Sequence, residues 1–139
     1  GVSSAALSVG LGLGEMREAL AYSMERTQFG HAGSEFQAIQ WMFADMGTEL
    51  EAAELMTFRA AYLKDAGCPH TREAAMAKLF ASEAAMRATI KAVQVFGGYG
   101  YTQEYPAERY MRDAKLCEIG EGTSEVQRII IARDLIRSH

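Results

Sequence analysis

The longest regular pattern in the chain lies at residues 34–66, which read SEFQAIQWMFADMGTELEAAELMTFRAAYLKDA. Apolar residues recur there at steps of three and four, from Phe36 through Met46 and Leu50 to Leu63, as they do on one face of an α-helix. Ser34 and a glutamine three residues later have the spacing of a capping box, which marks a helix start. We therefore predict one helix of roughly 30 residues, about 45 Å long.

Three further segments, at residues 2–26, 71–96 and from Thr123 or Ser124 to the C-terminus, show the same helical spacing. Stretches that contain glycine or proline separate the segments, at residues 28–33, 67–70 and 97–101. Pro106 is expected to open a short additional helix. Long antiparallel helices joined by short connections indicate an all-α protein, an up-down four-helix bundle that forms a single domain over residues 1–139.

The first predicted helix contains Gly10, Gly12 and Gly14, and each glycine lowers helix propensity by about 1 kcal/mol relative to alanine. Two interpretations stay open, because small residues can allow a neighbouring helix to approach closely or can simply be tolerated. The apolar face of this helix is predicted to consist of Val2, Ala5, Ala6, Val9, Leu13, Met16, Leu20 and Met24.

The composition, with 49% hydrophobic and 23% charged residues, is typical of a globular domain. A net charge of -4 and dispersed arginines favour no nucleic-acid partner. Cys68 and Cys117 have neither a disulfide framework nor metal-ligand spacing, so we predict no metal site. No stretch approaches the roughly 20 apolar residues of a membrane span. Since Gly1 stands directly before a helical pattern, we expect the chain to be a piece of a longer protein.

Two polar features stand near the first predicted turn. Arg26 ends the first helix and is followed by Phe29 and Gly30; it can stabilise the helix dipole or bind a phosphate group with two hydrogen bonds. Gln37 and Gln40 share one side of the next helix's first turn. They can serve as a cap and a solvated amide, or they can hydrogen-bond a ligand that lies over the preceding loop.

A glycine-rich stretch runs from Gln94 to Tyr101 and reads QVFGGYGY. Its glycines allow the backbone to approach a ligand or a second chain closely, although a helix C-cap accounts for at least one of them. No strand precedes it, so it is not a dinucleotide fingerprint. The charged and aromatic stretch at residues 104–114 fits a salt-bridged surface corner better than direct catalysis.

The stretch EIGEGTSE at residues 118–125 is the most informative one. Glu121 lies between two glycines, immediately before a predicted helix start. Glycines let a substrate approach the backbone, and the free N–H groups of a helix N-terminus favour an ionised carboxylate. Glu121 is therefore either a general base or a residue that merely stabilises the helix.

Together these stretches resemble the C-terminal domain of the acyl-CoA dehydrogenases, close to the short-chain and butyryl-CoA branch, from about Val2 to Ile136. The resemblance depends on the order and spacing of several motifs. These are Arg26-x-x-Phe29-Gly30, Gln94 to Tyr101, Glu104 to Arg109, Arg112-Asp113-Ala114 and Glu121 to Arg128.

The resemblance implies a role for the segment around Glu121. Acyl-CoA dehydrogenases desaturate an acyl-CoA thioester between Cα and Cβ, and Glu121 matches the base that removes the α-proton while the β-hydrogen leaves as hydride to FAD. Gly122 matches a position that lines the substrate. Thr123, Ser124 and Glu125 match the segment that contacts the FAD of the same subunit.

The resemblance also implies contacts to the FAD of a neighbouring subunit, with Arg26 at its pyrophosphate. The remaining predicted cofactor contacts are Phe29, Gln37, Gln94, Val95, Phe96, Gly97 and Gly98. Acyl-CoA as substrate, an electron-transfer flavoprotein as acceptor and a homotetramer with this domain in its helical core are further implications. The family's setting is fatty acid metabolism, in the bacterial cytoplasm or the mitochondrial matrix.

Two departures from the family pattern matter. Gly120 stands where many relatives carry tyrosine, which leaves the acyl-chain preference open. The N-terminal helical domain and the middle β-domain of the family are absent from this sequence. We therefore expect the isolated chain to be inactive and to bind FAD weakly or not at all. The alternative is a helical assembly module without enzymatic activity, or one half of a split dehydrogenase.

Overall fold

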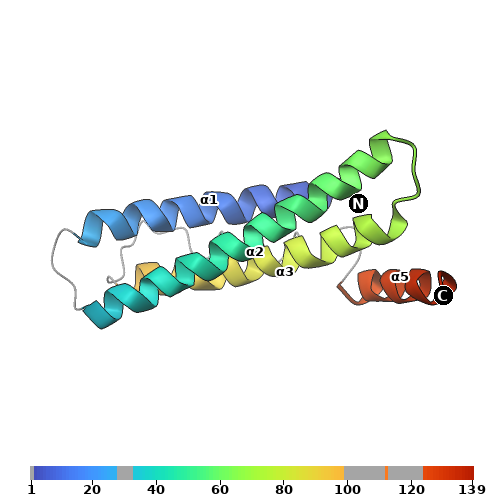
Figure 1. The fold of residues 1–139 in the computed structure, drawn as a ribbon. Helices are drawn as coiled ribbons and strands as arrows, with labels where there is room; N and C mark the ends of the chain where they lie inside the picture. The colour runs from blue at the N-terminus through green and yellow to red at the C-terminus, as the bar shows by residue number, and fades with distance from the viewer. Residues whose placement is uncertain (1, 28–32, 99–111, 113–123) are drawn as a thin grey trace.

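The computed structural model describes residues 2–27, 33–98, 112 and 124–139 of the 139-residue chain. Four helices lie within these ranges: α1 (Val2–Thr27), α2 (Gly33–Asp65), α3 (Thr71–Gly98) and α5 (Ser124–Arg137) (Figure 1). The described ranges contain no strand, so the predicted all-α class is confirmed. None of the described helices is long and apolar enough to cross a membrane.

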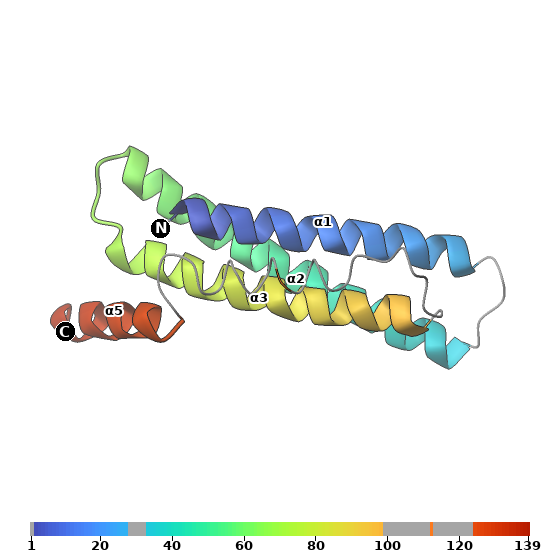
Figure 2. The same cartoon turned by 180° about the vertical axis from the view of Figure 1, so that it is seen from behind.

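The three long helices α1, α2 and α3 lie side by side, and each contacts the other two (Figures 1 and 2). Helices α1 and α3 run in the same direction, while α2 runs in the opposite one. The predicted fourth helix is present as α5, but it has only 14 residues and packs against the first half of α3. Within the described residues, the bundle therefore consists of three long helices and a short one.

The helix boundaries follow from local chemistry. Gly67 adopts a left-handed φ of 71°, which is accessible to glycine without strain. The backbone N–H of Cys68 donates to the carbonyl of Leu63 at 2.9 Å, and that of Gly67 donates to Lys64 at 3.1 Å. These two bonds form a Schellman motif, which ends α2. In contrast, the sequence prediction ended the third helix too early, because α3 continues through Gly97 and Gly98. Two glycines at the last turn of a 28-residue helix are tolerated.

Alanine dominates the core. The buried alanines are Ala5, Ala19, Ala53, Ala60, Ala75, Ala77, Ala81, Ala84, Ala85, Ala88 and Ala92. Most of them belong to α3, the central helix that contacts all the other described helices. Because alanine side chains are short, helices that meet through them can lie close together. Larger residues such as Met46 and Leu50 fill the remaining space between α1, α2 and α3.

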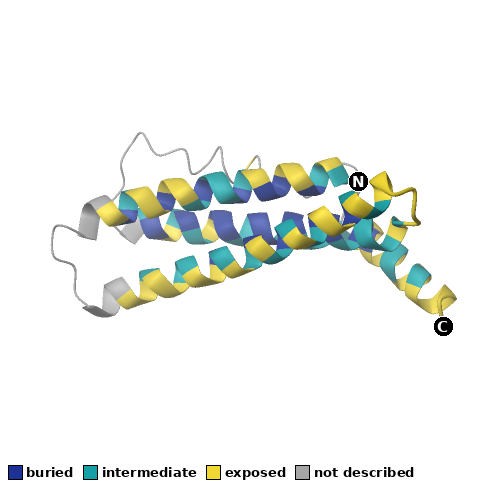
Figure 3. Ribbon diagram, turned by 45° about the horizontal axis from the view of Figure 1, so that its top comes forward, coloured by how far each residue is buried: buried dark blue, intermediate teal, exposed yellow. Residues whose placement is uncertain are grey.

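The predicted apolar face of α1 was partly wrong. Leu20 is 40% exposed and Met24 is 64% exposed, whereas the polar residues Ser8, Glu15 and Ser23 are buried (Figure 3). The buried face is rotated toward the alanine surface of α3, where small side chains fit better than large ones. The hydrogen bond from the Thr89 hydroxyl to Glu15 offsets part of the cost of burying that carboxylate.

The two interpretations of the glycines in α1 apply to different positions. A Cβ atom added at Gly12 would lie 2.5 Å from Leu50 Cδ2 and 3.5 Å from the Cα of Ala85. Gly12 is therefore needed for close packing between α1, α2 and α3. A Cβ at Gly10 or Gly14 would meet nothing within 4 Å, so these two glycines are only tolerated.

Candidate functional site

One end of the bundle gathers the first group of predicted site residues. Helix α1 ends there, α2 begins and α3 ends, because α1 and α3 are parallel and α2 returns between them (Figures 1 and 2). Arg26 belongs to the last turn of α1, and Gln94 belongs to the last turns of α3. The tertiary structure thus brings together segments that are more than sixty residues apart in the sequence.

Two exposed amides and a helix N-terminus characterise this end. The side chains of Gln37, in the second turn of α2, and Gln94 are both exposed. The N-terminus of α2 carries the positive end of the helix dipole and backbone N–H groups without intrahelical partners. Amides and free N–H groups of this kind are suited to bind a phosphate or another anionic group.

The neighbouring residues of α3 are mainly structural. Val95 is 1% exposed and packs with Ala19 and Ala92, so any contact between Val95 and a ligand would have to come from its backbone. The ring of Phe96 is half-buried and lies against Tyr22, with ring centroids 4.6 Å apart and planes tilted by 40°. Together these contacts join the ends of α1 and α3.

A second group lies at the start of α5. Ser124 is the first residue of the helix, and Glu125 is exposed in its first turn. Arg128 Nη2 contacts Glu83 Oε1 of α3 at 2.8 Å, and Arg72 Nε contacts Asp134 Oδ2 at 3.2 Å. These two pairs hold α5 antiparallel to α3, with its N-terminus directed toward the end of the bundle where α3 ends.

Two residues of α3, one from the first group and one that holds α5, lie on one side of that helix. Glu83, which holds α5, and Gln94, in the first group, are eleven residues apart (94 minus 83), or about three helical turns. Residues at this spacing point in nearly the same direction and are separated by about 16 Å along the helix axis.

Several predicted residues lie outside the described part of the chain. Phe29, Glu121, Gly122 and Thr123 belong to the undescribed segments. Arg26, Gly97 and Gly98 are described only as helix backbone. The roles proposed for these side chains stay predictions.

Ser124, at the start of α5, carries an unsatisfied polar group. Its hydroxyl oxygen is buried and has no hydrogen-bond partner. An unsatisfied buried hydroxyl lowers stability unless another molecule satisfies it. The residues present therefore fit a polar cofactor such as FAD at this position. Among the described residues, no group of three or more His, Cys, Asp or Glu side chains could hold a metal ion.

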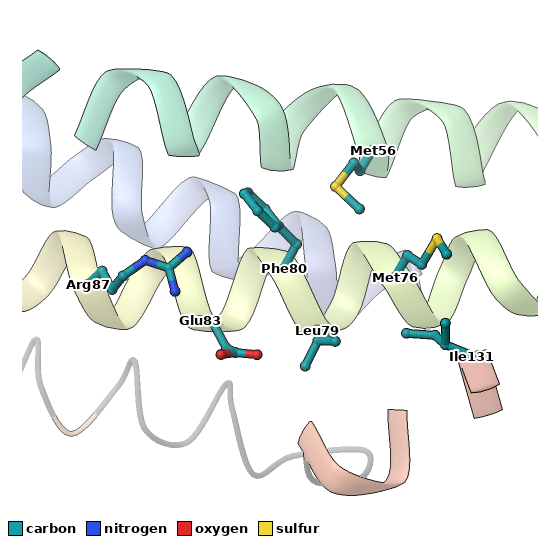
Figure 4. A pocket seen from close by; sticks show the side chains of 7 residues that line it. All are labelled: Met56, Met76, Leu79, Phe80, Glu83, Arg87 and Ile131. Atoms are coloured by element: carbon teal, nitrogen blue, oxygen red, sulfur yellow. The ribbon is translucent and has the colours of Figure 1, made fainter. Parts of the chain in front are cut away.

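A separate pocket of about 380 Å³ lies between α2, α3 and α5 (Figure 4). Its lining consists of Met56, Met76, Leu79, Phe80, Glu83, Arg87 and Ile131. The charged residues at its rim are already paired, since Arg87 contacts Glu49 and Glu83 contacts Arg128, each at 2.8 Å. None of the predicted site residues lines this pocket.

A buried polar pair between α1 and α3 was not predicted from the sequence. Glu15 is 1% exposed and Thr89 is fully buried, and the Thr89 hydroxyl donates a hydrogen bond to Glu15 Oε2. The spacing did indicate that Glu15 is buried. Glu15 lies three residues after Gly12 and four before Ala19, and both of these residues are on the buried face of α1. An apolar periodicity search passes over a carboxylate at such a position.

The comparison with known families agrees with this architecture. Residues 2–136 match the family described as "Acyl-CoA dehydrogenase, C-terminal domain". The chain therefore belongs to the acyl-CoA dehydrogenase family, whose members are oxidoreductases and FAD flavoproteins, and it corresponds to the family's helical C-terminal domain. The predicted family membership is thereby confirmed.

Individual relatives are similar over nearly the whole chain. The short-chain specific acyl-CoA dehydrogenase of Clostridium acetobutylicum is 52% identical over 136 residues, which cover 98% of this chain and 36% of that protein. The mitochondrial short-chain specific enzyme of Bos taurus is 50% identical over 139 residues, 100% of this chain and 33% of that protein. The structure of butyryl-CoA dehydrogenase from Megasphaera elsdenii has a TM-score of 0.88 at 45% identity, covering 97% of this chain and 35% of that one. The chain thus spans about a third of the length of these relatives.

Proposed function

We propose that this chain is the part of an acyl-CoA dehydrogenase that supplies the catalytic base, and that Glu121 is this base. The observation that carries the proposal is the family match over residues 2–136, which includes the segment from Glu121 to Glu125. Helix α5 begins at Ser124, three residues after Glu121. A carboxylate just before a helix N-terminus stays ionised and is ready to accept a proton.

In the proposed reaction, Glu121 would remove the α-proton of an acyl-CoA thioester. FAD, when bound, would supply the hydride-accepting chemistry for the β-hydrogen. Gly122 leaves room for the substrate next to the base. Thr123, Ser124 and Glu125 hold the cofactor of the same subunit, and the unsatisfied hydroxyl of Ser124 supports this assignment. The similarity to short-chain specific relatives favours a short acyl group.

The group of residues at the ends of α1 and α3 and near the start of α2 is proposed to bind the FAD of a neighbouring subunit. Arg26 and Phe29 lie at the end of α1 and after it, Gln37 near the start of α2, and residues 94–98 at the end of α3. The convergence of these helix ends, with two exposed amides, supports the proposal. It requires a homo-oligomer, for which we propose a tetramer, and we propose an electron-transfer flavoprotein as acceptor.

The substitution Glu121→Gln tests the proposed base. It is made in the native protein that contains this chain. The substitution keeps the size of the side chain but removes its basicity, so we expect turnover of a short-chain acyl-CoA to fall by about 10²–10⁴-fold. The flavin absorbance of the variant should stay at the wild-type level. This combination separates the loss of a base from the loss of the cofactor.

Asp45→Asn is the matched control, because Asp45 is exposed on α2 and belongs to neither group of site residues. It should leave turnover unchanged. Turnover of the Glu121→Gln variant at the wild-type rate would remove Glu121 from the mechanism. The 139-residue chain alone should be inactive and should bind no stoichiometric FAD, and a stable yellow protein would contradict that expectation.

A further inference from the structure

A buried hydrogen bond joins the middle of α1 to the second half of α3. The Thr89 hydroxyl donates to Glu15 Oε2, and both side chains lie inside the bundle. Burial of a carboxylate costs free energy, because the carboxylate loses its contact with water. An alanine at position 15 would suit a contact between closely packed helices without that cost. Stability alone therefore does not account for a glutamate at this position.

The rest of the contact between α1 and α3 is made of short apolar side chains. One core cluster contains Ala5 and Val9 of α1 with Ala77, Ala81 and Ala84 of α3, and another contains Ala19 with Ala92. Because one methyl group is like the next, a small shift of α1 along α3 changes the buried apolar area little. A directional polar contact within an apolar helix pair is a recognised means of fixing the register of the two helices.

Both helices continue from this pair toward the end of the bundle that carries the first group of predicted site residues. Helices α1 and α3 are parallel (Figures 1 and 2). Arg26 lies eleven positions after Glu15, and Gln94 lies five positions after Thr89. These spacings correspond to about 16 Å and about 8 Å along the helix axes, so the backbone at position 26 lies about 9 Å beyond that at position 94. Any axial shift at the buried pair changes this offset by the same amount.

We propose that Glu15 and Thr89 form a positioning pair, which fixes the axial register of α1 against α3 and thereby holds Arg26 and Gln94 at the spacing that binds FAD. This inference rests on the proposed function of this end of the bundle as a cofactor site. Hydrogen bonds from arginine to a phosphate require about 2.7–2.9 Å between the heavy atoms. A misplacement of about 1 Å in a site of this kind can reduce its effect by about 10²-fold.

The substitution Glu15→Ala separates positioning from stability in the native protein that contains this chain. It removes the buried carboxylate together with the hydrogen bond, while the Thr89 hydroxyl keeps the carbonyl of Ala85, 2.9 Å away, as an acceptor. The urea midpoint of unfolding should therefore stay at or above the wild-type value. The Kd for FAD, measured by titrating the flavin-free protein and following flavin fluorescence, should nevertheless rise by about tenfold or more.

Two further variants provide matched controls. Glu15→Gln keeps an oxygen that can accept the Thr89 hydroxyl, so its Kd for FAD should stay within about threefold of wild type. Ala60→Gly introduces a flexible residue at a fully buried position of α2, in the same core cluster as Ala5 and Ala77. It should lower the urea midpoint without changing the Kd for FAD. Equal rises in Kd for Glu15→Ala and Ala60→Gly would overturn the proposal, since FAD binding would then follow stability alone.

The substitution Arg26→Ala tests the cofactor site independently of the positioning pair. It should raise the Kd for FAD, because it removes the proposed phosphate contact. A raised Kd in Arg26→Ala with an unchanged Kd in Glu15→Ala would overturn the positioning pair and retain the cofactor site. An unchanged Kd in Arg26→Ala would overturn the cofactor site at this end of the bundle, and the positioning pair with it.

A comparison at position 89 repeats the test from α3 and applies even if Glu15→Ala does not fold. Thr89→Ser keeps the hydroxyl donor, whereas Thr89→Val keeps the shape of the side chain and loses the donor. The Kd for FAD should be about tenfold higher in Thr89→Val than in Thr89→Ser. Equal Kd values in these two variants would show that the hydrogen bond to Glu15 does not position the cofactor residues.

Discussion

Helix α3 contacts α1 on one side and α5 on another, and the two contacts are built from different chemistry. The contact with α1 is made of small buried residues, including Gly12 against Ala85, and of the hydrogen bond from Thr89 to Glu15. The contact with α5 uses the partly exposed ion pairs of Glu83 with Arg128 and of Arg72 with Asp134. A pocket of about 380 Å³ opens beside it.

The difference explains how one helix can serve both as a core element and as a support for the site. Close packing without solvent fixes the register of α1 and α3, and with it the helix ends that carry Arg26 and Gln94. Exposed ion pairs contribute little stability, since solvent screens them. The α3–α5 contact should therefore open more readily than the α1–α3 contact, next to the segment that contains Glu121.

The largest effect is expected from the buried hydrogen bond of the α1–α3 contact. Thr89→Val keeps the shape of the side chain but leaves Glu15 without the hydroxyl donor, so we expect the free energy of unfolding to fall by about 1–3 kcal/mol. Urea denaturation measures the change. Thr57→Val is the control, because Thr57 is also buried but bonds only the carbonyl of Ala53. Equal losses in the two variants would mean that the Glu15 contact contributes nothing specific.

Smaller changes in the free energy of unfolding are expected when two glycines of α1 are replaced by alanine, and the two changes should have opposite signs. Gly12→Ala should lower the free energy of unfolding by about 1 kcal/mol, because overpacking against Leu50 exceeds the gain in helix propensity. Gly10→Ala should raise it by up to about 1 kcal/mol, because the added methyl group meets no atom within 4 Å. Thermal unfolding of both variants checks the signs. A stabilised Gly12→Ala variant would remove the requirement for close approach.

The smallest effect is expected at the α3–α5 contact. A double-mutant cycle with Glu83→Gln and Arg128→Gln should give a coupling of about 0.5 kcal/mol, since the two side chains are 32% and 55% exposed. The coupling should decrease in high salt. A coupling of several kcal/mol that salt does not affect would show that α5 is held as firmly as α1, and the proposed contrast would be lost.

Much of the fold could be predicted because helical periodicity is a local signal. The stop of α2 at Gly67 and the start of α5 near Ser124 follow from spacing and capping residues, whereas α2 begins at Gly33, one residue before the predicted cap Ser34. The buried face of α1 could not be predicted in the same way. Leu20 and Met24 are apolar yet exposed, while Glu15 is charged yet buried, because the shape and hydrogen-bonding groups of α3 decide which side of α1 is covered.

The candidate site also has some features that could be predicted from the sequence and others that required the structure. Motif order and spacing were sufficient to predict the family, since residues 2–136 carry the pattern as a whole. The side chains of Arg26 and Phe29 and the segment from Glu121 to Thr123 lie outside the described part of the chain, so their roles stay predictions. The exposure of Gln37 and Gln94 and the unsatisfied hydroxyl of Ser124 required the structure.

The sequence by itself determined the helix content, the turns and the family, because each depends on residues that are close together in the chain or on motifs in a set order. Only the tertiary structure decided that the ends of α1 and α3 meet beside the start of α2, that Gly12 is the glycine needed for packing, and that Leu55, Phe58 and Tyr62 remain exposed. These facts depend on which faces of distant helices contact each other. Periodicity alone does not specify that pairing, since a neighbouring helix can cover either an apolar or a small polar stripe.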